Sequence, residues 1–310
     1  MVSVMGKRGL FLVWLCLVNI LPGMAQTEKL IDYVNPFVGT DGYGNVYPGA
    51  QIPFGGIQMS PDTDSKYYDA ASGYKYNHST LLGFSLTHLS GTGIPDLGDF
   101  LFISGTGEMK LDPGTREEPE KGYRSRYSHE KEWASPNYYA VELSDYGVKA
   151  EMTSGVRSGM FRFTYPQSDK AFIMIDMNHT LWQSCEWANL RMENDSTITG
   201  YKLVKGWGPE RHIYFTATFS KKLTGLRFMQ NKKPVIYNTS RFRSSYEAWG
   251  KNLMACISFD TKAGEEVIVK TAISSVSTNG AKNNMAELAG LTFDDLKAKG
   301  EALWEKELGK

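Results

Sequence analysis

The chain has 310 residues, and its 34 lysines and arginines balance 34 aspartates and glutamates, which argues against a protein that tracks nucleic-acid phosphates. Hydrophobic residues make up 41% and charged residues 22% of the chain, which excludes wholesale disorder. The aromatic share of 13% suits a β-rich protein or one that stacks on sugar rings.

The first segment has the pattern of a secretory signal peptide. Lys7-Arg8 precedes an apolar run over residues 10–21, and the small-residue exit Gly23-Met24-Ala25 comes next. A membrane anchor, the alternative, needs about 20 apolar residues, and the run is shorter. We expect residues 1–25 to be cleaved after Ala25, leaving a mature chain that is exported, periplasmic or extracellular, with no membrane segment.

Two regions of different composition and patterning follow one another along the chain. Residues 31–107 are rich in Gly, Pro, Asp and Tyr, which predicts long shaped loops between short strands. From about residue 138 to 274 the sequence alternates between apolar and polar residues or forms short apolar runs. These patterns predict strands at residues 139–143, 148–152, 161–165, 171–177, 212–219, 253–257 and 266–270. Many short strands favour an all-β fold, a large antiparallel β-sandwich with long loops, over residues 26–278.

The last residues, 279–310, are expected to form a short helical linker. Helical patterns cover residues 280–289 and 292–308, with Thr292 as N-cap and Asp295 three positions later, as in a capping box. Leu296, Leu303 and Trp304 are expected to lie exposed on one face of the second helix. That face either packs on the sandwich or leads into a helical domain beyond it.

Two cysteines remain after signal cleavage, and their pairing is open. Cys185 and Cys256 could form one disulfide in an oxidising compartment. Cys256 lies in an apolar run that predicts a buried strand, so a free core thiol is at least as compatible with the sequence.

Few residues stand out as carriers of chemistry. The acidic run at residues 62–64 begins like a calcium loop, but Tyr67 replaces the turn glycine, so we expect a solvated acidic turn. The densest polar cluster spans residues 84–99, where His88 and Asp96 could hydrogen-bond sugar hydroxyls. The alternative is a satisfied loop histidine and a turn-capping aspartate. No pair of carboxylates stands out as the acid and base of glycoside hydrolysis.

Several linked motifs together resemble the N-terminal domain of glycoside hydrolase family 92, a family of exo-acting α-mannosidases. The matching stretches are Tyr33-Val34-Asn35-Pro36-Phe37-Val38-Gly39-Thr40, Tyr47-Pro48-Gly49-Ala50, Pro53-Phe54-Gly55-Gly56, Ser72-Gly73-Tyr74, Gly83-Phe84-Ser85-Leu86-Thr87-His88-Leu89-Ser90-Gly91-Thr92-Gly93 and Asp96-Leu97-Gly98-Asp99. The resemblance covers essentially the whole mature chain, in order. Two stretches depart from it: Asp41-Gly42-Tyr43-Gly44-Asn45 replaces a His-rich glycine loop, and Tyr67-Tyr68 stands where many members have tryptophan.

The resemblance implies an enzyme in two parts, of which this chain is the first. The family joins a β-sandwich to a larger (α/α) barrel, removes terminal α-mannose with inversion and needs calcium. The acid–base pair and the calcium ligands belong to the barrel, so the resemblance implies no catalytic residue and no metal ligand here. It implies a substrate-binding role, toward a mannose-containing glycan, for Asp41, Tyr43, Ser72, Tyr74, His88, Ser90 and Asp96.

Three interpretations therefore stay open. The chain is the substrate-binding part of an α-mannosidase, a stand-alone carbohydrate-binding module, or an inactive structural fragment of a truncated gene. In all three we expect the isolated chain to turn over no α-mannoside at any calcium concentration, and no nucleic acid to bind it.

Overall fold

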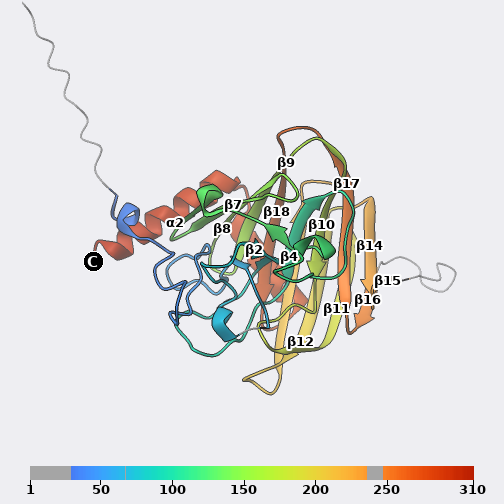
Figure 1. Cartoon of the computed structure of the whole chain (residues 1–310), viewed down its shortest axis with the longest axis horizontal. Coiled ribbons are helices and arrows are strands. Elements are labelled where there is room, and N and C mark those ends of the chain that lie inside the picture. The colour runs from blue at the N-terminus through green and yellow to red at the C-terminus, as the bar shows by residue number, and fades with distance from the viewer. Residues whose placement is uncertain (1–28, 67, 236–246) are drawn as a thin grey trace, which may run out of the picture.

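The computed structural model describes residues 29–66, 68–235 and 247–310. The expected signal peptide, residues 1–25, lies outside this part of the chain. The described residues form two large antiparallel sheets and one strand pair (Figure 1). The predicted all-β sandwich is thus confirmed.

The larger sheet has nine strands in the order β16-β11-β12-β13-β18-β9-β8-β7-β6. Its hairpins come from the alternating half of the sequence, because period-two patterning puts one face of each strand toward the core. In sheet order, the strands are Glu247–Gly250, Ser184–Asn194, Thr197–Lys205, Arg211–Phe219, Glu265–Ser274, Ser158–Tyr165, Val148–Ser154, Tyr138–Leu143 and Glu132–Ser135.

The smaller sheet has seven strands in the order β1-β3-β4-β10-β17-β14-β15. They are Ser60–Asp62, Gly83–Ser85, Leu101–Thr106, Ser168–Asp176, Leu253–Thr261, Gly225–Gln230 and Lys233–Pro234. The separate pair joins β2, Thr80–Leu81, to β5, Ser125–Arg126. All seven predicted strands are therefore confirmed, and long loops separate β1, β3 and β4.

Aromatic rings fill the space between the two sheets. Phe102 of β4 lies 4.9 Å, between ring centroids, from Phe161 of β9, and Phe100 lies 4.5 Å from Phe215 of β13. A second apolar cluster, which includes Cys256, covers the opposite face of the seven-stranded sheet. Cys256 lies in a buried strand, as predicted, and both it and Cys185 are free thiols.

Two helices close the described chain, and both pack on the sandwich. The predicted helix at 280–289 is the shorter α1, Thr278–Asn284, which continues as the 3-10 turn Met285–Leu288. The second is α2, Phe293–Leu308, and its capping box between Thr292 and Asp295 is confirmed. None of the helices in the described ranges is long and apolar enough to cross a membrane.

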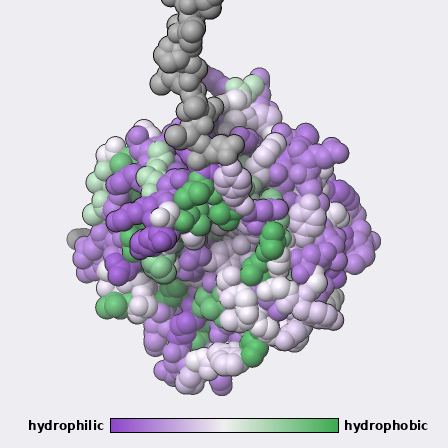
Figure 2. All heavy atoms as spheres, turned by 90° about the vertical axis from the view of Figure 1, so that its left-hand side faces the viewer, coloured by the Kyte–Doolittle hydropathy of each residue, from purple (hydrophilic) through white to green (hydrophobic). Residues whose placement is uncertain are grey.

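The expectation that α2 exposes its apolar face is wrong in part. Leu296 is buried, and the Trp304 indole donates to the backbone oxygen of Gln51 at 2.7 Å, while Leu303 stays 44% exposed. The helix packs on β8 and β9 because their outer face offers it apolar and aromatic partners. Figure 2 faces this side of the molecule and shows small hydrophobic patches separated by polar residues.

The described 3-10 turns are short. They are Leu30–Tyr33, Tyr68–Ala70, Pro119–Lys121, His129–Lys131 and Met285–Leu288. The first lies beside the end of α2, where Glu305 accepts hydrogen bonds from the backbone nitrogens of Leu30 and Ile31 at 3.1 and 2.7 Å. These hydrogen bonds hold the first described residues against the last turns of α2.

Candidate functional site

Four glycine-rich or polar segments meet at the ends of the strands of the seven-stranded sheet. The Gly91 nitrogen donates to the Asn45 oxygen at 2.7 Å, and the Leu181 nitrogen donates to the Leu97 oxygen at 3.0 Å. A rigid scaffold that holds several loops together is a common way of building a binding site. We call this group the loop cluster; it comprises residues 39–49, 62–66 with 68–76, 85–99 and 179–183.

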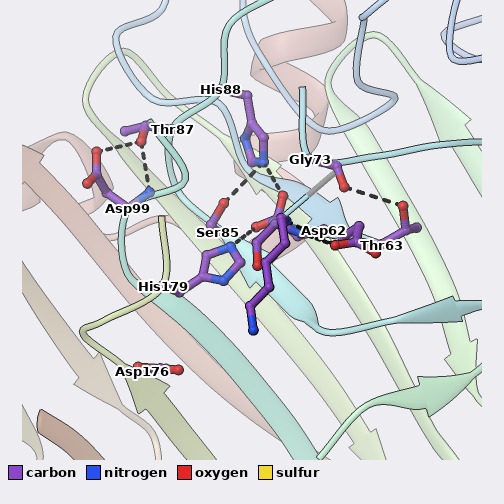
Figure 3. Close-up of polar contacts among 12 residues, drawn as sticks. Asp62, Thr63, Gly73, Ser85, Thr87, His88, Asp99, Asp176 and His179 are labelled. Atoms are coloured by element: carbon purple, nitrogen blue, oxygen red, sulfur yellow. Dashed lines mark hydrogen bonds and ion pairs between the residues drawn. The ribbon is translucent and has the colours of Figure 1, made fainter. Parts of the chain in front are cut away.

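A buried carboxylate, Asp62, lies at the centre of the loop cluster (Figure 3). It accepts hydrogen bonds from Nε2 of His88 at 2.8 Å and Nε2 of His179 at 2.7 Å. The other ring nitrogen of His88 lies 2.8 Å from the backbone oxygen of Gln58. Because that oxygen can only accept, Nδ1 of His88 donates to it, while Nε2 also lies 3.1 Å from the Ser85 hydroxyl.

This environment keeps Asp62 ionised. Burial alone would raise its pKa, but the charges and hydrogen bonds of His88 and His179 outweigh burial and hold the pKa well below its usual value. A carboxyl with so low a pKa cannot donate a proton at neutral pH. The expected solvated acidic turn at residues 62–64 is therefore wrong, because Asp62 and Asp64 are both buried.

A second buried charge group lies next to the first. Asp99 forms an ion pair with Lys202 at 3.1 Å and another with Arg211 at 2.6 Å, and the side chains of Asp99 and Lys202 have no exposed surface. These two cations outweigh the effect of burial and hold the pKa of Asp99 well below its usual value. Lys202 also donates to the backbone oxygen of His179 at 2.6 Å, which connects the two groups.

Three of the predicted site residues lie exposed on the rim of the loop cluster. Tyr43 is 89% exposed, and Asp41 and Ser90 are exposed as well. Lys75 supports this rim from below, since its ammonium donates to the Gly42 oxygen and lies 4.0 Å from the Asp41 carboxylate. These three side chains face solvent.

The other four predicted residues are buried and hold the loops in place. His88 is held by Asp62, as described above. The Ser72 hydroxyl donates to the Asn45 oxygen, and the Tyr74 hydroxyl donates to Glu132 at 2.9 Å. Asp96 is 8% exposed and accepts from its neighbouring nitrogen, that of Leu97, at 2.6 Å.

Sequence reasoning missed His179, Trp182, Lys202 and Arg211. Trp182 is 53% exposed, adopts a positive φ of 64° and meets the ring of Tyr68 edge-on at 6.1 Å. A positive φ in a bulky residue costs free energy and is concentrated at functional sites. The sequence did offer one signal for His179 and Trp182: both follow directly after the buried strand β10, and loops at strand ends commonly carry functional residues.

The residues of the loop cluster do not fit a calcium ion. Both oxygens of Asp62 are taken by histidines, and Asp64 accepts from the backbone nitrogens of Ser65 and Lys66 at 2.7 and 3.0 Å. Calcium needs six to eight free oxygen ligands. Nowhere in residues 29–66, 68–235 or 247–310 do three or more His, Cys, Asp or Glu side chains group in a way that could hold a metal.

Comparison with known proteins gives a consistent result. Residues 33–274 match the Glycosyl hydrolase family 92 N-terminal domain. A family GH92 α-mannosidase from Bacteroides thetaiotaomicron, solved in complex with mannoimidazole, is 89% identical with a TM-score of 0.89, over 91% of this chain and 37% of that one. An inverting GH92 mannosidase from B. thetaiotaomicron VPI-5482 shares the fold, with 24% identity and a TM-score of 0.75, over 92% of this chain and 37% of that one.

Among curated proteins, an uncharacterized secreted glycosidase from Arthroderma benhamiae is 30% identical over 148 residues, which is 47% of this chain and 19% of that protein. The chain therefore spans well under half the length of the relatives it matches.

Proposed function

Because this chain belongs to glycosyl hydrolase family 92, as its N-terminal domain, we propose that it forms the sugar-facing rim of an exported glycosidase that removes terminal α-mannose from glycans. The observation that carries the proposal is the loop cluster, in which the exposed Asp41, Tyr43 and Ser90 lie above the buried ion pair of Asp62 and His88. The names of the similar proteins, an α-mannosidase and a secreted glycosidase, supply the substrate class and the export.

The charges of the loop cluster favour binding over proton transfer. Asp62 and Asp99, its central carboxylates, have pKa values held well below the usual range, so neither can protonate a leaving group. Their part is to fix the loops so that hydroxyls and carboxylates on the rim meet a sugar without reorganising. The acid, the base and the calcium of the complete enzyme then come from the longer part that its relatives have, in an (α/α) barrel.

The first experiment measures turnover and binding by the purified mature chain. We expect no hydrolysis of an aryl α-mannoside over the whole calcium range, and weak binding of methyl α-mannoside that Tyr43→Ala lowers. Tyr33→Ala is the control, because Tyr33 is also highly exposed, at 70%, but lies in the first 3-10 turn. Turnover by the chain alone would overturn the assignment of catalysis to the barrel. An equal loss of mannoside affinity in Tyr43→Ala and Tyr33→Ala would overturn the assignment of sugar binding to the rim.

The alternatives differ in the sequence that the gene encodes beyond residue 310. A reading frame for a helical barrel, continuous or after one frameshift, supports the first part of an α-mannosidase. Unrelated sequence together with saturable mannoside binding supports a stand-alone carbohydrate-binding module, and unrelated sequence without binding supports an inactive fragment.

A further inference from the structure

A cavity of about 670 Å³ opens beside the loop cluster. Its floor is apolar and includes Leu82, Met229 and Met254, which lie on the face of the seven-stranded sheet that points away from the nine-stranded sheet. Its walls include His179 and Trp182. An apolar floor with a few convergent polar groups is typical of small-molecule sites, and the volume falls in their usual range of roughly 300–1,000 Å³.

His179 brings a ring nitrogen to the wall of this cavity. Its side chain is 3% exposed, and Nε2 donates to Asp62 at 2.7 Å. None of the residues that the structure describes gives Nδ1 of His179 a hydrogen bond. A ring nitrogen on a cavity wall can bond to a ligand hydroxyl, because a hydroxyl group both donates and accepts.

A buried acceptor and a flat aromatic ring complete the wall. Asp176, 8% exposed, accepts from the Tyr123 hydroxyl at 3.2 Å and the Asn178 nitrogen at 2.8 Å, and its carboxylate has further acceptor capacity. Trp182 is half exposed and its ring is steadied by Tyr68. Such a ring offers a face on which the C–H side of a pyranose can stack.

The charges around the cavity point to an uncharged ligand. Two carboxylates, Asp112 and Asp176, are balanced by two ammonium groups, Lys66 and Lys232, and Lys232 pairs directly with Asp112. The charges of these four side chains cancel, so they select neither an anion nor a cation. Polar groups that can bond to hydroxyls, an aromatic face and balanced lysines and aspartates together describe a neutral polyhydroxylated ring.

We propose that this cavity is a second saccharide-binding site, which takes one or two neutral pyranose units of a glycan. A ligand hydroxyl forms a hydrogen bond with Nδ1 of His179, and a ring face stacks on Trp182. The site goes beyond the rim of the proposed function: Figure 3 shows His88 and His179 reaching Asp62 from different directions, and the cavity lies on the side of His179. Asp62 connects the two sites, because it holds one histidine of each.

The test monitors the indole NMR signal of Trp182 in the mature chain during titration with an α-linked mannobiose, with affinities of the variants from calorimetry. His179→Gln keeps a donor to Asp62 but removes Nδ1, and Trp182→Ala removes the stacking face. Each is expected to weaken binding at the cavity by at least about tenfold. Trp249→Ala is the matched control, because Trp249 is also 53% exposed but lies on β16.

Tyr43→Ala, which disables the rim, separates this proposal from the proposed function. A saturable shift of the Trp182 signal that persists in Tyr43→Ala and fails in His179→Gln supports the second site, even if rim binding is not found. A shift that disappears in Tyr43→Ala assigns the binding to the rim and overturns the proposal. The absence of a shift overturns it as well, and so does an equal shift with glycerol.

Discussion

Replacing Asp62 by asparagine tests whether the charge of this side chain holds the loop cluster together. The substitution keeps the size of the side chain but removes the negative charge between His88 and His179. A hydrogen bond to a charged group contributes about 1.5–3 kcal/mol, and breaking a buried ion pair costs about 3–5 kcal/mol. Since asparagine can still accept one of the two bonds, we expect Asp62→Asn to lower the free energy of unfolding by about 3 kcal/mol.

The assay is urea unfolding of residues 26–310 at neutral pH, monitored by circular dichroism. Asp195→Asn is the control, since the Asp195 side chain is 66% exposed and lies 3.6 Å from Lys222. This control is expected to change the free energy of unfolding by less than about 0.5 kcal/mol. If Asp62→Asn loses no more than the control, the two histidines do not need a negative charge, and the stabilising role of Asp62 is refuted.

Four further outcomes are expected. The folded-state pKa values of Asp62 and Asp99 are depressed, so below the unfolded carboxyl pKa of about 4 the unfolded chain binds more protons than the folded chain. The free energy of unfolding should therefore fall as the pH drops below about 4, and it should fall less steeply in Asp62→Asn. An equal slope in the variant would contradict this. Lys202→Met should cost about 3 kcal/mol in urea unfolding, because it leaves Asp99 buried with one cation fewer; a neutral result would show that Arg211 suffices. Thr292→Ala should cost about 1 kcal/mol by removing the N-cap of α2, seen as faster hydrogen exchange in its first turn, and unchanged exchange would argue against the capping box. Burial raises the pKa of Cys256 to about 12, so a disulfide reagent should label it only after unfolding, and rapid labelling of the folded chain would place it at the surface.

Local patterns carried most of the fold prediction. Strand β9 could be predicted because Phe161, Phe163 and Tyr165 alternate with polar residues, and a strand of this kind needs only its own sequence to show which face is buried. Helix α2 could be predicted from Thr292 and Asp295 for the same reason. The burial of its apolar face could not, because that depends on the partners that β8 and β9 offer on their outer surface.

The centre of the loop cluster escaped prediction because its partners lie far apart in the sequence. Asp62 looks like part of a solvated turn when only its neighbours at residues 60–64 are considered, since acidic residues beside Pro and Ser usually face water. Its two partners are His88, 26 positions away, and His179, 117 positions away. No periodicity joins residues at such separations; only the pairing of β1 with β3 and of β4 with β10 brings them together. The exposed residues of the rim could be named from short motifs, whereas the charges beneath them required the assembled sheet.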